Sequence, residues 1–113
     1  MAPRVYRHPR TIEILVREYE FLAVESPRAS EATAEKFLVA VERTLEAIAG
    51  TPRIGRRWTR SPVVKELRYF PVRDFENWLI FHAEIPDGIV FLTVIHGARD
   101  LPRSMEDLDG QDE

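Results

Sequence analysis

Residues 77–96, NWLIFHAEIPDGIVFLTVIH, decide the fold that we expect for this chain. Runs of β-branched and aromatic residues at 77–85 and 89–96 flank the tripeptide PDG at 86–88, which is typical of a hairpin turn. A third run of the same character, at 63–72, comes before them. We therefore predict three consecutive antiparallel strands.

Alternation along these strands assigns the two faces of the sheet. A two-residue loop at Asp87 and Gly88 would pair Ile85 near Val90, and a one-residue shift of that turn would exchange the faces. The predicted core face carries Leu79, Phe81, Ala83, Val90, Leu92 and Val94. The opposite face is of mixed polarity and is a candidate binding surface, with Trp78, Ile80, His82, Glu84, Phe91, Thr93 and Ile95.

The first half of the chain has the period of amphipathic helices. One helix is expected from Thr11, as N-cap, with an apolar stripe of Ile12, Leu15, Val16, Tyr19, Leu22 and Ala23. Ser26 and Pro27 end it and start a second helix that runs to about Ala49. The stripe of this second helix is Ala34, Leu38, Val41, Leu45 and Ile48.

The short break between the two helices predicts an antiparallel helical hairpin that packs on the sheet. Residues 3–7 alternate in polarity and are predicted to form an edge strand that ends at Pro9. The expected fold class is therefore α+β, with an N-terminal helical hairpin packed on a small antiparallel β-sheet. One domain is expected over residues 1–105, followed by an acidic, disordered tail at 106–113.

Composition excludes several classes of protein. The 113 residues include no cysteine, which rules out disulfides, thiolate metal sites and cysteine nucleophiles and favours the cytoplasm. The longest apolar run, at 89–95, is too short to span a membrane. The three histidines, His8, His82 and His96, lack the spacing of metal ligands, so we expect no metal and no cofactor.

Charge is distributed unevenly along the chain. Between Arg53 and Arg73 the sequence has seven basic residues and one acidic residue, Glu66, an excess that suits a polyanion or an acidic protein as well as a solvated loop. Trp58 lies in this segment between arginines, which is typical of a phosphate contact and equally of a structural loop. On the first helix, Ile14 and Phe21 lie off the core stripe, where another chain could cover them.

RNA cleavage by acid–base chemistry is a further hypothesis. It requires a proton acceptor, a proton donor and a cation at the phosphate. Arg68, Arg73, His82, His96 and Arg99 are the available candidates, and their ordinary interpretation is structural.

Several local strings, in their joint order, resemble the ParE/RelE superfamily of bacterial type II toxins and, within it, the ParE branch. The resemblance covers roughly residues 3–103. The strings are AEKF at 34–37 with Leu45 and Ile48, TPRIGR at 51–56, ELR at 66–68, WLIF at 78–81 and VIHGARD at 94–100. It implies a toxin that is held inactive by a cognate ParD-like antitoxin whose acidic segment wraps the toxin.

The two branches imply different mechanisms. RelE-like members cut messenger RNA on the ribosome with basic residues and often a C-terminal tyrosine, whereas ParE-like members resemble that fold without its catalytic set and stabilise the cleaved-DNA complex of DNA gyrase. Here no tyrosine follows Tyr69, which favours gyrase poisoning and a protein that is not itself an enzyme. A ribosome-dependent endoribonuclease that uses Arg68, Arg73 and His96 is the alternative, and an inactive antitoxin-binding corepressor is the second alternative.

The resemblance and the charge pattern together define the expected contacts. The target-binding residues are expected to be Arg56, Arg57, Trp58, Arg60 and Arg99. The antitoxin-binding residues are expected to be Ile14, Phe21, Trp78, Ile80 and Phe91. DNA is expected to be contacted only through gyrase or the antitoxin.

Overall fold

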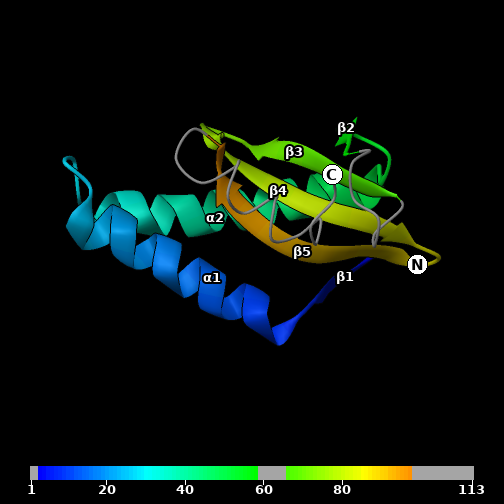
Figure 1. Cartoon of the computed structure of the whole chain (residues 1–113), viewed down its shortest axis with the longest axis horizontal. Coiled ribbons are helices and arrows are strands. Elements are labelled where there is room, and N and C mark those ends of the chain that lie inside the picture. The colour runs from blue at the N-terminus through cyan, green and yellow to red at the C-terminus, as the bar shows by residue number, and fades with distance from the viewer. Residues whose placement is uncertain (1–2, 59–65, 98–113) are drawn as a thin grey trace, which may run out of the picture.

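A computed structural model describes residues 3–58 and 66–97 and shows an α+β fold. Figure 1 shows the sheet with the helices packed along one side of it. This confirms the predicted fold class. The elements in chain order are β1 (Arg4–Arg7), α1 (Pro9–Glu20), the π-helical η1 (Phe21–Glu25), α2 (Glu31–Gly50), β2 (Arg56–Arg57), β3 (Leu67–Val72), β4 (Phe75–Ile85) and β5 (Gly88–His96).

Within the described residues, the sheet has five strands in the order β1-β5-β4-β3-β2. Its centre is the predicted antiparallel set, in which β4 pairs with β3 on one side and with β5 on the other. The predicted edge strand is β1, which pairs in parallel with β5. Strand β2 was not predicted, because two arginines carry no pattern of alternation.

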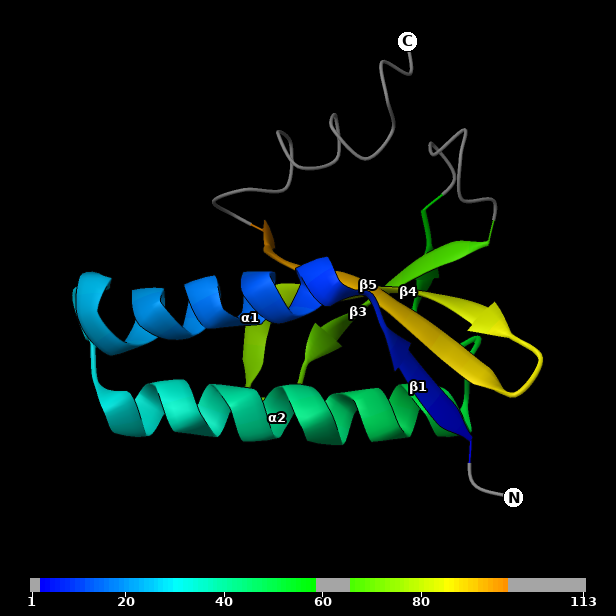
Figure 2. The same ribbon diagram turned by 90° about the horizontal axis from the view of Figure 1, so that it is seen from below.

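The helices form the predicted antiparallel hairpin. Figure 2 shows α1 and α2 running side by side in opposite directions, joined at one end. Within this layer α1 contacts β5, whereas α2 contacts β1, β3 and β5. Both helices therefore cover the same face of the sheet.

The start of α1 differs from the prediction. The N-cap is His8, whose Nδ1 accepts a hydrogen bond from the backbone N–H of Arg10, and Pro9 occupies the first helical position. Thr11 is instead fully buried, and its hydroxyl donates to the carbonyl oxygens of Phe91 and Leu92 at 3.3 and 3.2 Å. Thr11 thus ties α1 to β5 rather than capping the helix.

The start of α2 also differs, because the helix begins four residues after the predicted proline. Its N-cap is Ser30, whose hydroxyl accepts from the backbone N–H of Thr33 at 3.1 Å. Ser26 accepts from the N–H of Arg28 in the loop between the helices. The predicted end of this helix is confirmed within one residue, since α2 extends to Gly50.

Part of the predicted apolar stripe of α1 is wrong. Ile12 and Val16 are 57% and 52% exposed, whereas Ile14, predicted to lie off the core, packs against it. The buried positions Thr11 and Glu18 explain the error, because two polar residues face the core and an apolar pattern alone rotates the predicted face.

The main core lies between the helices and the sheet. The stripe predicted for α2 is confirmed, since Ala34, Val41, Leu45 and Ile48 are fully buried and Leu38 packs against them. Phe37 joins this stripe, with its ring centre 5.3 Å from that of Trp78. The sheet contributes Val72, Trp78, Ile80, Ile89, Phe91 and Val94.

The predicted assignment of the sheet faces is therefore wrong for most positions. Trp78, Ile80 and Phe91 lie beneath the helices, and Phe81 belongs to a separate buried cluster on the other face, where Ile95 lies as predicted. The alternation did not distinguish the faces because the sheet carries apolar side chains on both. Val94 is on the helix-covered face, as predicted.

The turn and a bulge account for the remaining differences in register. The hairpin loop is Pro86 and Asp87, so that Ile85 pairs with Gly88. Farther along, the register shifts by one residue at Leu92, where His82 pairs with Phe91. The bulge turns Val94 to the same face as Phe91 although the two residues are an odd number of positions apart.

Candidate functional site

The described part of the predicted basic segment borders the edge of the sheet formed by β2 and β3. Arg57 pairs with Arg68 in the strand register, and Arg56 pairs with Tyr69. Gly55 precedes β2 with a φ of 93°, and a Cβ there would collide with the carbonyl oxygen of Tyr69. Only glycine fits this close approach, which brings the loop after α2 onto β3.

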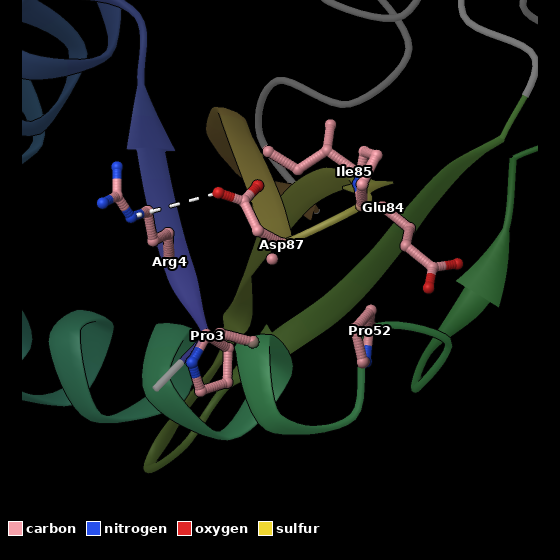
Figure 3. Close-up of a pocket in the computed structure, with 9 residues that line it drawn as sticks. Pro3, Arg4, Pro52, Glu84, Ile85 and Asp87 are labelled. Atoms are coloured by element: carbon pink, nitrogen blue, oxygen red, sulfur yellow. Dashed lines mark ion pairs between the residues drawn. The ribbon is translucent and has the colours of Figure 1, made fainter. Parts of the chain in front are cut away.

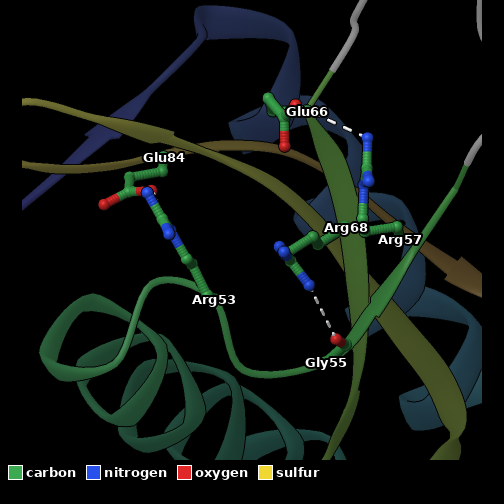
Figure 4. A network of polar contacts seen from close by, with 6 residues as sticks. All are labelled: Arg53, Gly55, Arg57, Glu66, Arg68 and Glu84. Carbon is green, nitrogen blue, oxygen red and sulfur yellow. Dashed lines mark hydrogen bonds and ion pairs between the residues drawn. The ribbon is translucent and has the colours of Figure 1, made fainter.

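The arginines of this edge differ in their contacts, as Figure 4 shows. Arg53 forms an ion pair with Glu84 at 3.0 Å, and Arg57 forms one with Glu66 at 3.5 Å. Arg68 donates from Nη1 to the carbonyl oxygen of Gly55 at 3.2 Å. The side chain of Arg56 is exposed and makes no hydrogen bond or ion pair with any of the residues that the structure describes.

These contacts leave the edge able to bind an anionic partner. The two ion pairs are solvent-exposed, so each stabilises the fold only weakly and is readily exchanged. A phosphate or carboxylate of a partner can therefore replace Glu66 beside Arg57 at little cost.

Trp58 belongs to the face of the sheet that the helices leave uncovered. Its ring centre lies 6.3 Å from that of Tyr69 and 6.2 Å from that of Phe81, both in edge-on contact. Leu67, Phe81 and Ile95 are buried in this second cluster. Trp58 thus anchors the basic loop to the sheet, and its partly exposed ring stands beside Arg57 in the chain.

His82 is the buried titratable group nearest to this edge. It pairs with Arg68 in the register of β3 and β4 and has no exposed surface. Neither ring nitrogen has a hydrogen-bond partner among the described residues. Burial, and to a lesser extent the charge of Arg68, lowers the pKa of His82 to about 4, so its ring is neutral at physiological pH.

The residues proposed for RNA cleavage do not converge. Arg68 lies opposite His82 on β4, whereas His96 lies opposite Trp78, four residues away along the same strand. At roughly 3.3 Å per residue this separates them by about 13 Å along β4. Arg73 is in the exposed turn between β3 and β4, away from Arg68.

His96 belongs instead to a small polar cluster that the sequence analysis missed. Trp78 donates from Nε1 to a carboxylate oxygen of Glu18 at 3.0 Å, and the ring centre of His96 is 4.5 Å from that of Trp78. Glu18 is only 5% exposed. The only feature of the sequence that indicates the burial of Glu18 is its position seven residues after Thr11, on the same face of the helix.

Three of the predicted antitoxin-binding residues are core residues. Trp78, Ile80 and Phe91 are at most 7% exposed and lie under the helices, so they offer no surface to a partner. Ile14 and Phe21 are partly buried against the same core, and their role stays a prediction. The exposed apolar side chains of α1 are Ile12 and Val16.

Figure 3 shows a pocket between β1, the end of α2 and the hairpin turn of β4 and β5. Its polar groups are already paired within the chain, since Asp87 lies 3.9 Å from Arg4 and accepts a hydrogen bond from Tyr6. Gly88 closes this end, because a Cβ there would collide with the carbonyl oxygen of Arg4.

Other predicted features fall outside these observations. Arg60, Arg99 and the tail at 106–113 lie outside the described residues. Within residues 3–58 and 66–97 no group of histidine and carboxylate side chains is arranged to hold a metal ion. The helices of that same part of the chain are too short or too polar to cross a membrane.

Comparison with known proteins places this architecture in a family. A search of curated proteins gives no match. The family model for the ParE toxin of parDE type II toxin–antitoxin systems matches residues 5–101. Because this match extends from β1 to beyond β5, the chain belongs to the ParE family of type II toxin–antitoxin toxins.

Proposed function

We propose that this toxin acts in the cytoplasm by poisoning DNA gyrase, whose cleaved-DNA complex it stabilises, and that a ParD-like antitoxin neutralises it. In this proposal the chemistry belongs to gyrase. The toxin supplies only a higher affinity for the cleaved state, which shifts the population of gyrase toward that state. It needs no cofactor for this.

The observation that carries the proposal is the distance between Arg68 and His96, which lie opposite residues of β4 that are four positions apart. Acid–base cleavage of RNA needs its proton-transfer groups and its phosphate-binding cation within hydrogen-bonding reach of one substrate. His96 contacts Trp78 near the buried Glu18, and Arg68 reaches toward Gly55 at the other end. This distribution favours an inhibitor that acts by binding over a nuclease.

The contacts with gyrase or its cleaved DNA are assigned to the basic edge of the sheet. Arg56 is exposed and unpaired among the described residues, and Arg57 has a weak, exposed ion pair. Trp58 holds these arginines against the sheet, which reduces the conformational entropy that binding must remove. Arg60 and Arg99 extend the same proposal on the evidence of the sequence.

The antitoxin is assigned a different surface, the helical hairpin. Ile12 and Val16 form an exposed apolar pair one helical turn apart on α1. Apolar side chains of an antitoxin segment would remove this pair from water, next to the partly buried Ile14.

The test is to incubate the purified toxin with gyrase, supercoiled plasmid and ATP, and then to count covalently cleaved plasmid after detergent and protease treatment. We expect linear plasmid to accumulate only when gyrase is present. The double variant Arg56→Glu/Arg57→Glu should reduce this accumulation at least about tenfold, the effect of losing roughly 1.4 kcal/mol of binding. Arg28→Glu, an exposed reversal in the loop between the helices, is the matched control.

Three outcomes would contradict the proposal in different ways. Normal supercoiling without cleaved plasmid would exclude gyrase poisoning, and translation assays on ribosomes would then test RNA cleavage with Arg68, Arg73 and His96 variants. Unimpaired cleavage by the double variant would exclude the basic edge as the contact. Normal growth of cells that express the chain alone would indicate an inactive corepressor.

A further inference from the structure

We propose that a second docking site for the antitoxin lies in a groove between α2 and the turn that joins β3 to β4, and that it takes an acidic segment with an apolar anchor. This inference rests on the proposed function, because it presumes an antitoxin, but it concerns a surface not assigned above. The groove has a volume of about 840 Å³. Its lining is Ala32, Thr33, Glu35, Lys36, Val39, Ala40, Arg43, Arg73, Asp74 and Phe75.

The groove is held in shape by contacts beneath it. The hydroxyl of Thr44 donates to the carbonyl oxygen of Ala40 at 2.7 Å and accepts from the backbone N–H of Arg73 at 3.1 Å. Thr44 is fully buried and thus fastens the turn to α2. The ring of Phe75 packs edge-on against Phe37 with ring centres 5.4 Å apart. Both walls are therefore ordered before a partner arrives, which lowers the cost of binding.

The α2 wall of the groove has an apolar centre between two cations. Val39 is 51% exposed, although it lies in the middle of a long helix. Lys36 stands one turn before it and Arg43 one turn after it. Arg73 faces this row from the other wall. The side chains of these three cations form no ion pair or hydrogen bond with other described residues.

This combination selects an acidic peptide in preference to a nucleic acid. The cations on both walls can pair with carboxylates of a partner. Between these cations, Val39 and Phe75 can contact one apolar side chain of the same partner. Glu35 and Asp74 also line the groove, and they would repel a continuous phosphate backbone while leaving room for separated carboxylates. The row from Ala32 to Arg43 is about 16 Å long at 1.5 Å per residue, enough for a helical partner segment of three turns.

The site is distinct from the two surfaces already assigned. It lies on the side of α2 near β3, whereas Ile12 and Val16 belong to α1, which contacts β5. Arg56 and Arg57 are on β2, which pairs with Tyr69 and Arg68 in the first half of β3, several residues before the Arg73 turn. An antitoxin that binds both the α1 pair and the groove would therefore contact the helical hairpin on two sides.

The experiment uses the full-length chain and, as probe, the full-length antitoxin encoded beside its gene. The groove variants are Lys36→Glu/Arg43→Glu and Val39→Asp, and the matched controls are Arg28→Glu and Val24→Asp, at exposed positions outside the groove. We expect each groove variant to weaken antitoxin binding at least about tenfold, and each control to change it less than about twofold. Binding by the wild type should weaken with added salt, and less so for the charge-reversed variant.

Growth provides an independent readout, because the groove variants keep the proposed gyrase contacts. Cells that express Lys36→Glu/Arg43→Glu should stop growing even when the antitoxin is co-expressed, whereas the wild-type toxin should be neutralised. Exchanging carboxylates for lysines in the antitoxin segment should restore binding to the charge-reversed variant. Thermal unfolding of each variant checks that it is folded.

The outcomes separate failure of this inference from failure of the proposed function. If the wild type does not bind the antitoxin, the proposed neutralisation fails, and this site fails with it. If the wild type binds and both groove variants bind equally well, the groove is not a docking site, although the neutralisation stands. If the charge reversals abolish binding of duplex DNA and leave antitoxin binding intact, the groove is a nucleic-acid site and the inference is wrong.

Discussion

Two buried rings on the same face of β4 have opposite surroundings. Trp78 donates its N–H to Glu18 of α1, whereas His82, four residues on, has no hydrogen-bond partner for either nitrogen within the described residues. Both lie between the sheet and the helical layer. The buried ring at the end of β4 under α1 thus has a hydrogen-bond partner, whereas the buried ring at the end beside Arg53 and Gly55 has none among the described residues.

The difference shows how one sheet face holds two polar groups by different means. At Trp78 a carboxylate is buried along with the indole, and each provides the partner that the other requires. At His82 the ring loses its proton instead, since burial lowers its pKa to about 4 and makes the neutral form stable. One site is stabilised by a contact, and the other by a change of charge.

The largest expected effect on stability comes from removing the ring that has its hydrogen-bond partner, Trp78. Trp78→Ala removes a ring that touches Phe37, Phe75 and His96 and leaves Glu18 without its indole donor. We expect the free energy of unfolding to fall by about 3–5 kcal/mol. Urea denaturation measures this, and a loss below about 1 kcal/mol would mean that the core repacks around the cavity.

Acid should lower the stability of the fold through His82, the buried ring at the other end of β4. The pKa of His82 in the folded chain, about 4, is below its ordinary value of 6.5, so between these values the unfolded chain binds more protons than the folded one. The stability contributed by the neutral ring is therefore complete above pH 6.5 and is lost as the pH falls toward 4, by about 3 kcal/mol in all. Denaturation at a series of pH values measures the slope.

The variant His82→Leu isolates this slope from the titration of carboxylates. If the wild type and the variant lose stability equally between pH 6.5 and 4, His82 is not the group responsible.

A smaller effect is expected at neutral pH. His82→Leu replaces two unsatisfied nitrogens with apolar atoms in a fully buried site, so we expect the free energy of unfolding at pH 7 to rise by about 1 kcal/mol. Thermal unfolding checks this. A marked destabilisation would indicate that the imidazole makes a polar contact that the described residues do not include.

The smallest effect tests the share of Arg68. Its charge lowers the pKa of His82 less than burial does, so Arg68→Met should raise that pKa by less than half of the way from about 4 back to 6.5. Titration of the His82 ring signal by NMR measures the shift. A return of the pKa to 6.5 would show that charge, rather than burial, dominates.

The sequence predicted the elements of the fold better than their orientation. The period of Ala34, Val41, Leu45 and Ile48 identified both α2 and its buried face, because every position of that stripe is apolar. The face of α1 was rotated because Thr11 and Glu18 face the core and Ile12 and Val16 face water. Side-chain polarity cannot reveal such exchanges, which depend on partners far away in the chain.

The candidate site was predicted only in part. The basic character of the edge at Arg56 and Arg57 follows from the local charge excess. The separation of Arg68 from His96 and the burial of Trp78, Ile80 and Phe91 depend on strand register and on which face the helices cover. The strand register could not be predicted because both faces of the strands are apolar. The hydrophobic pattern therefore fits almost equally well after a shift of one residue.

The parallel pairing of β1 with β5 affects how the chain folds while it is being made. Arg4 pairs with Gly88, so the first strand waits for a partner that is synthesised 84 residues later. The helical hairpin and its local contacts can form on the ribosome, but the sheet cannot receive β1 until the last described strand has emerged. A nascent chain that has not yet reached β5 therefore leaves this edge of the sheet incomplete, with β1 exposed and unpaired.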